Sequence, residues 1–133
     1  MVADRRRSAT IGKLDTIFRF VDDRLAVASA ASTHRCDLIG NKLYVFGGWN
    51  GKKALNDLHV LDVDLIDKPD QFEELWSEAF PIGTVPATRN NHISVVVHRT
   101  KIFIHGGHDG EKWLNDLHIL DTERMSWLMP NVA

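Results

Sequence analysis

The sequence predicts an all-β protein built from two copies of one four-stranded unit. Three observations support this prediction: an internal repeat, short apolar segments with the alternation of strands, and glycine-containing turn dipeptides between them. The chain has 133 residues, of which 44% are hydrophobic and 26% charged, and its formal net charge is −2. These values are ordinary for a folded protein and give no reason to expect a nucleic acid or an anionic membrane as its partner.

An N-terminal segment, residues 1–30, precedes the repeated units. Apolar residues recur in it at spacings of three and four, which predicts an amphipathic helix over residues 11–28. The apolar stripe consists of Ile11, Leu14, Phe18, Val21, Leu25 and Ala28. We interpret it as a helix that packs on the β structure or as a weakly ordered leader. The alternatives are a coiled-coil or partner-binding helix, and the degenerate outer strands of a preceding repeat. Three arginines before Ser8 raise the hypothesis that Ser8 is phosphorylated.

The repeat is clearest in two sixteen-residue segments. Residues 47–62 read GGWNGKKALNDLHVLD, and residues 106–121 read GGHDGEKWLNDLHILD. Eleven of these 16 positions are identical at a constant offset of 59 residues. Each unit then reaches a tryptophan, but the first unit holds about eight more residues before it, within an insertion at about 63–75. Without the insertion, the repeat is about 50 residues long.

Each unit is expected to contain four short strands. In the first unit, residues 35–39 form the first strand, and residues 42–46 form a second strand that ends at the Gly47-Gly48 pair. In residues 42–46, Leu43 and Val45 alternate with Tyr44 and Phe46, so both faces of the expected strand are apolar. This pattern is typical of a strand buried on both faces. Sheets stacked face to face, as in a β-propeller, would bury it in this way.

Four features recur in each unit and together resemble the kelch-repeat family. They are a histidine near the first strand, a Gly-Gly pair, an Asn-Asp-Leu segment and a tryptophan. In order, these are His34, Gly47-Gly48, Asn56-Asp57-Leu58 and Trp76, then Arg89 with His92, Gly106-Gly107, Asn115-Asp116-Leu117 and Trp127. The resemblance implies an incomplete kelch-type β-propeller with two four-stranded blades, one in residues 31–80 and one in residues 81–133.

The chain departs from the family pattern at several positions. The first unit lacks the Pro-x-x-Arg segment that Pro86 to Arg89 supply in the second, and His59 and His118 replace an aromatic residue that often follows Asn-Asp-Leu. Kelch propellers usually close with five to seven blades. The two blades therefore belong to a longer protein, complete a ring by self-association, or have one face covered by the N-terminal segment.

Catalytic and metal-binding functions find no support in the sequence. The seven histidines include repeat equivalents, which indicates a packing role, so no metal and no cofactor are expected. A galactose-oxidase-like copper enzyme is the less favoured alternative, because that site needs a second ligand tyrosine and Tyr44 is the only tyrosine, with Cys36 the only cysteine. The single cysteine fits a cytoplasmic protein, with the nucleus as the alternative.

The sequence instead predicts a protein–protein interaction module that acts as a scaffold or adaptor. The alternative is a fragment of a larger kelch protein, such as a ubiquitin-ligase substrate receptor, a small-GTPase effector or a kelch-phosphatase. Loops on a rigid scaffold commonly carry binding residues. The predicted partner surface consists of Trp49, Asn50, Lys52, Lys53, Arg89, Asn90, His108, Asp109, Glu111, Lys112 and Trp113. The residues with a predicted structural role are Gly47, Gly48, Asn56, Asp57, Trp76, Gly106, Gly107, Asn115, Asp116 and Trp127.

Overall fold

The computed structural model describes residues 35–130 of the chain. The predicted helix over residues 11–28, the remainder of segment 1–30, Ser8 and His34 lie outside the described residues. Among the described residues, no helix has the length and apolar character needed to cross a membrane.

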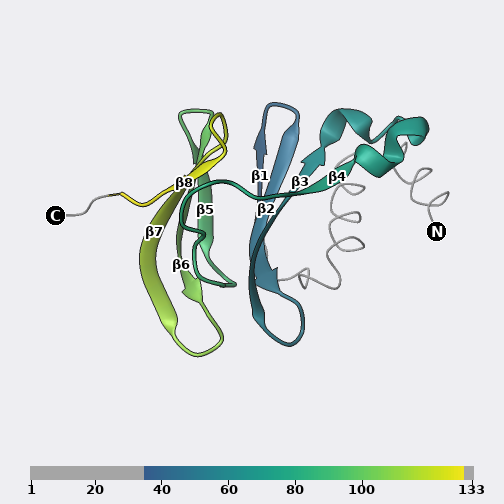
Figure 1. Ribbon diagram of the computed structural model, residues 1–133. Helices are drawn as coiled ribbons and strands as arrows, with labels where there is room; N and C mark the ends of the chain where they lie inside the picture. Colours follow the sequence, from purple (N-terminus) through teal and green to yellow (C-terminus); the bar gives the residue numbers. More distant parts are fainter. Residues whose placement is uncertain (1–34, 131–133) are drawn as a thin grey trace.

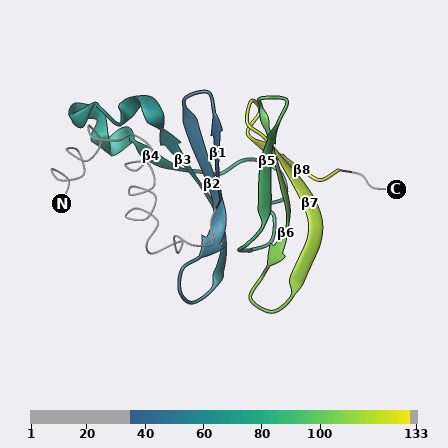
Figure 2. The ribbon, with the colours of Figure 1, turned by 180° about the vertical axis from the view of Figure 1, so that it is seen from behind.

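Two antiparallel four-stranded sheets stand side by side, each with its strands in sequence order (Figures 1 and 2). The first sheet contains β1 (Arg35–Ile39), β2 (Lys42–Trp49), β3 (Ala54–Asp62) and β4 (Trp76–Ala79). The second sheet contains β5 (Ile93–Val97), β6 (Lys101–His108), β7 (Trp113–Asp121) and β8 (Ser126–Leu128). The predicted all-β fold with two four-stranded blades is confirmed.

The glycine pairs do not end the second strand of each unit, so that prediction is wrong. β2 continues through Gly47 and Gly48 to Trp49, and the register with β3 shifts between Phe46 and Gly48. An equivalent shift lies between His105 and Gly107 in β6. In each sheet the extra residue lies on the partner strand, because Asn56 and Asp57 oppose the single Gly47 and Asn115 and Asp116 oppose the single Gly106. Each Gly-Gly pair thus faces a β-bulge, which bends the partner strand without ending the pairing.

The core between the two sheets follows from the alternation of side chains along each strand. Tyr44, Phe46 and Leu58 of the first sheet face the second sheet, and the ring of Phe46 lies edge-to-face against Trp127 at 5.1 Å. Ile102, Ile104 and Leu120 complete the cluster from the other side. This contact buries one of the two apolar faces that the sequence shows on the second strand of each unit.

The insertion of the first unit covers the opposite face of the first sheet. It forms two 3-10 helices, η2 (Val63–Leu65) and η3 (Pro69–Glu74), drawn in teal beside β4 in Figure 1. Next to them, Ile66 and Leu75 are fully buried against the core on that side of the first sheet. The extra residues therefore add apolar side chains that shield part of this face from water.

The outer face of the second sheet, by contrast, presents exposed apolar side chains. Strand pairing places Ile93, Val95, Phe103, Ile119 and Leu128 on this face, away from the first sheet. Ile93 and Val95 are 60% and 51% exposed. At the offset of 59 residues, Phe103 and Ile119 correspond to Tyr44 and Val60, which lie against the second sheet in the core between the sheets. An apolar sheet face of this kind is typical of a surface that a further element covers.

Candidate functional site

The connection between β4 and β5 joins the two sheets through the backbone of its last residues. The N–H of Arg89 donates to the carbonyl of Leu55, and the carbonyl of Arg89 accepts from the N–H of Gly48, both at 2.9 Å. The next residue, Asn90, exchanges two 2.9 Å hydrogen bonds with His108 of the second sheet. The sheets are thus joined by hydrogen bonds to successive residues of one segment.

The side chain of Arg89 is completely buried and binds the second sheet. Its Nη1 and Nη2 donate to Oδ1 and Oδ2 of Asp116 at 2.7 and 2.8 Å. Nη1 also donates to the carbonyl of Gly106 at 3.1 Å, and Nε donates to that of Ala87 at 3.0 Å. The two-pronged arrangement matches the planar guanidinium to the carboxylate. Arg89 and the buried Asn90 are therefore structural residues, and their predicted place on the partner surface is wrong.

The carboxylate of Asp116 is held in its ionised form. The hydrogen bonds from Arg89 are the largest cause, and that from His118 adds to them, so the pKa of Asp116 lies well below its ordinary value of 3.8. Nε2 of His118 lies 2.8 Å from Oδ2 of Asp116. The predicted structural role of the Asn-Asp pairs takes two forms. Asn56 donates to the carbonyl of Pro86, whereas the partners of Asp116 are side chains.

Stability should fall when the pH is lowered from about 5 to about 2. The unfolded chain takes up a proton at Asp116 near the ordinary pKa of 3.8, while the folded chain keeps the carboxylate ionised. The unfolded state then binds more protons, so its population grows as the pH falls. Urea unfolding at a series of pH values measures this slope. Asp116→Asn should show a smaller slope, and an unchanged slope would contradict this prediction.

Two tight turns project from the same end of the sheets, one from each. Oδ1 of Asn50 accepts the N–H groups of Lys52 and Lys53, both at 2.9 Å. In the second sheet, Oδ1 of Asp109 accepts those of Glu111 and Lys112, both at 2.8 Å. These hydrogen bonds lower the pKa of Asp109, that from Lys112 most. Asn and Asp commonly stabilise turns in this way, so both residues shape the loops.

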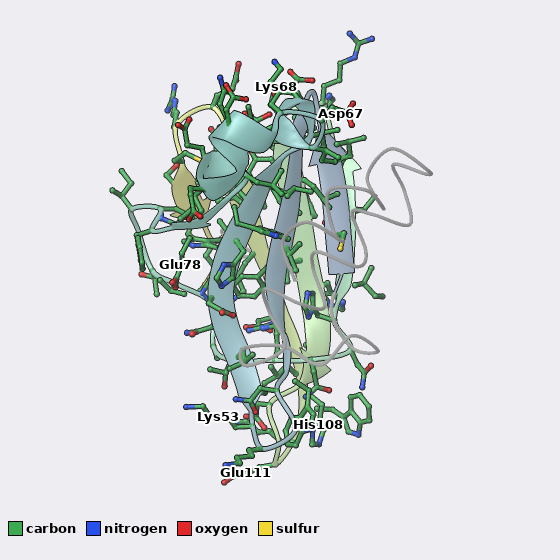
Figure 3. All side chains as sticks on the ribbon, turned by 90° about the vertical axis from the view of Figure 1, so that its right-hand side faces the viewer. Lys53, Asp67, Lys68, Glu78, His108 and Glu111 are labelled. Atoms are coloured by element: carbon green, nitrogen blue, oxygen red, sulfur yellow. The ribbon has the colours of Figure 1, made fainter. Side chains whose placement is uncertain are left out.

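A cleft of about 380 Å³ lies between these turns, and we call it the loop cleft. Figure 3 shows Lys53, Glu111 and His108 together at this end, far from Asp67 and Lys68. The loop cleft is lined by Trp49, Lys52, Lys53, Ala54, Leu55, Asn56, Thr88, Asp109, Gly110 and Glu111. Its walls therefore carry lysines from one sheet and carboxylates from the other, a pattern that suits a partner with charges of both signs.

The structure places the eleven predicted partner residues in three groups. Five line the loop cleft: Trp49, Lys52, Lys53, Asp109 and Glu111. Four lie in the same turns or at their ends without lining it: Asn50, Lys112, His108 and Trp113. The buried pair Arg89 and Asn90 forms the third group. The sequence analysis missed Thr88 and Leu55, because only the packing of the β4–β5 connection against β3 brings them together.

The two tryptophans near the turns differ in their surroundings. Trp113 is the first residue of β7 and is 74% exposed, with its ring edge-to-face against His108 at 4.9 Å. Trp49 is the last residue of β2 and is partly buried, and its ring reaches Gly110 of the other sheet. Neither lies in a loop as we predicted. Trp76 and Trp127 are buried in the two cores.

One group of side chains on the first sheet has the composition of a metal site. Asp57, His59 and Glu78 each bring one potential ligand atom, and these atoms lie within 4.8 Å of one another. His59 and Glu78 are paired across β3 and β4, so residues 19 positions apart meet through strand register. Nε2 of His59 lies 2.9 Å from Oδ2 of Asp57. The sequence analysis did not single out Glu78, because no local motif contains it.

Comparisons with known proteins agree with this architecture. A family model described as the KLHDC2/KLHL20/DRC7 Kelch-repeats domain matches residues 22–133. Acyl-CoA-binding domain-containing protein 5 of Arabidopsis thaliana is 35% identical over 91 residues, 68% of this chain and 13% of that protein. Tip elongation aberrant protein 3 of Schizosaccharomyces pombe is 31% identical over 131 residues, 83% of this chain and 12% of that protein.

The name of a third relative mentions kelch motifs. The Rab9 effector protein with kelch motifs of Danio rerio is 38% identical over 90 residues, 65% of this chain and 23% of that protein. The chain thus spans less than a quarter of the length of each of these three relatives. With the family model matching residues 22–133 and two four-stranded sheets in the described residues, the chain belongs to the kelch-repeat family.

Proposed function

We propose that this chain is a protein-interaction module that binds a segment of another protein in the loop cleft. The observation that supports this most is the position of the cleft between two turns whose shapes Asn50 and Asp109 hold in place. Turns that are already ordered lose less conformational entropy when a partner binds. Exposed tryptophans such as Trp113 are also enriched among residues that dominate binding energy.

Photo-crosslinking in the protein that naturally contains this chain tests the proposal. A photoreactive amino acid replaces Trp113 beside the loop cleft, or the exposed Arg124 in the turn after β7 as a matched control. We expect one discrete crosslinked protein from position 113 and none from position 124. Reversal of charges in the cleft, by Lys53→Glu with Glu111→Lys, should abolish that product. Equal products from both positions, or a product that survives the reversal, would reject the proposed site.

The same reasoning favours a non-catalytic scaffold or adaptor over an enzyme. The loop cleft is lined by lysines, carboxylates and small or apolar groups, and such a surface suits recognition. We place the protein in the cytoplasm, with the nucleus as the alternative. Immunofluorescence of the tagged natural protein distinguishes the two compartments.

A second proposal is that the two sheets work as blades of a larger propeller within a longer protein. The exposed apolar face of the second sheet favours it, because its repeat equivalent on the first sheet is covered by a neighbouring sheet. In such a protein another domain sets the overall role. The name of the Rab9 effector relative makes a small-GTPase effector one candidate, alongside a ubiquitin-ligase substrate receptor and a kelch-phosphatase.

The isolated chain should therefore self-associate through the outer face of the second sheet, and Val95→Glu should prevent it. Burying an apolar side chain of this size contributes about 1.5–3 kcal/mol, whereas burying an unpaired carboxylate is strongly unfavourable. Light scattering coupled to size exclusion measures the mass. Arg99→Glu, an exposed change in the turn after β5, is the control and should leave the mass unchanged. A Val95→Glu chain with the same mass as the parent would contradict this prediction.

A further inference from the structure

The first sheet has a carboxylate in the position where the second sheet binds an arginine. Asp57 corresponds to Asp116 at the repeat offset, and each accepts a hydrogen bond from the histidine two residues later. Asp116 also binds the guanidinium of Arg89, which stands three residues before His92. The residue three positions before His34 is Ala31, so the first unit lacks this arginine. Among the described residues, no lysine or arginine forms an ion pair with Asp57.

A second carboxylate increases the negative charge beside Asp57. Glu78 lies two residues after Trp76, and the corresponding residue after Trp127 is Met129. Where the second sheet has one carboxylate neutralised by an arginine, the first sheet has two carboxylates in reach of one histidine. In Figure 3, Glu78 projects from the side of the sheet, above the end that carries Lys53 and Glu111. Neighbouring carboxylates favour a cation between them.

The pocket beside these carboxylates has walls suited to a long basic side chain. Its volume is about 240 Å³, and Asp57 and Glu78 line it together with Phe80, Pro81 and Val85. Phe80 is 80% exposed, which is unusual for a phenylalanine. An arginine can lay its aliphatic stem on apolar groups and stack its planar guanidinium on an aromatic ring, while donating to carboxylates. The contact of Arg89 with Asp116 shows that guanidinium fits a carboxylate in this repeat position.

We propose that this pocket, the Asp57 pocket, binds an arginine side chain of a partner protein. The guanidinium donates to Asp57 and Glu78, and its stem packs on Phe80. Lysine binds less well, because its single ammonium nitrogen cannot make the planar pair of hydrogen bonds to one carboxylate that Arg89 makes to Asp116. The Asp57 pocket is a neighbour of the loop cleft, since Asn56 lines both, but its charged residues are different and it does not depend on that proposal.

Nuclear magnetic resonance of the ¹⁵N-labelled 133-residue chain tests the Asp57 pocket directly. The probe is N-acetyl-arginine amide, with N-acetyl-citrulline amide as a ligand of the same shape without the charge. We expect saturable shifts of the backbone amides of Asp57, Glu78 and Phe80 with the arginine compound only. The binding should weaken as salt is added, because the contacts are partly exposed.

Single substitutions separate this site from others. Asp57→Asn and Glu78→Gln should each weaken arginine binding about tenfold, the effect of losing one charge-assisted hydrogen bond. Asp70→Asn, an exposed change in η3, is the matched control and should leave the affinity unchanged. Lys53→Glu in the loop cleft should also leave it unchanged, so a failure of either site is distinguishable from a failure of the other. Because Glu78 is exposed, Glu78→Gln tests the pocket even if Asp57→Asn lowers stability.

Three results would overturn the proposal. The first is an equal response to the arginine and citrulline compounds, and the second is no response to either. The third is a response of the same three amides to zinc chloride with none to the arginine compound, because Asp57, His59 and Glu78 would then form a metal site.

Discussion

Arg89→Ala should lower the free energy of unfolding by about 3 kcal/mol. Removal of one partner of a buried ion pair costs about 3–5 kcal/mol, and the lower end applies because the Asp116 side chain remains 36% exposed. The substitution also leaves the carbonyl of Gly106 without its hydrogen bond from the guanidinium. Urea unfolding followed by tryptophan fluorescence measures the loss.

Two further variants make this test specific to the geometry of the pair. Arg89→Lys keeps the charge but cannot donate to both oxygens of Asp116 in one plane, so an intermediate loss is expected. Arg99→Ala removes an exposed arginine and should change stability by no more than about 0.5 kcal/mol. If Arg89→Ala and Arg99→Ala have equal effects, the connection between the sheets does not depend on this guanidinium.

Gly107→Ala should be at least as damaging, with an expected loss of about 3 kcal/mol or more. Gly107 has φ +97°, a conformation that strains a residue with a Cβ by roughly 1–2 kcal/mol. The added Cβ would also lie 2.6 Å from the carbonyl oxygen of Asn90, in the segment that joins the sheets. Backbone on that side cannot move without breaking the two hydrogen bonds between Asn90 and His108.

Gly51→Ala is a closely matched control for this prediction. Gly51 has φ +94°, so the backbone strain is nearly the same, but no atom beyond its two chain neighbours lies within 4 Å of the position of its Cβ. Its loss should be limited to the strain of roughly 1–2 kcal/mol. Thermal and urea unfolding of both variants give the difference, and equal losses would show that the close approach of Asn90 has no energetic effect.

Much of the local structure was predictable from the sequence because local patterns specify it. The eleven repeat identities, the two-sided apolar segments and the Asn-Gly and Asp-Gly dipeptides led to two four-stranded units, as the structure shows. The glycine pairs were recognised as special positions, but the β-bulges opposite them in β3 and β7 were not. A bulge depends on the register with the partner strand, and a single strand contains no record of that register.

The candidate sites depended more strongly on the tertiary structure. Trp, Lys and acidic residues in both turns led to the predicted partner surface. The structure places the two turns on opposite walls of one cleft. Arginine is usually a surface residue, so the sequence placed Arg89 on the partner surface. Only its contact with Asp116, 27 residues away, explains why it is buried. Glu78 was overlooked because it meets His59 only through the pairing of β3 with β4.

The sequence by itself determined that this protein is a kelch-type repeat with strands, turns and glycine positions in a regular order. These features arise from periodicity and backbone preference within a few residues. The tertiary structure alone decided which charged side chains are buried, which line a cleft, and which sheet face stays exposed. Those properties depend on contacts between residues far apart in the chain, because burial and charge pairing are set by the neighbours that packing brings within a few ångströms.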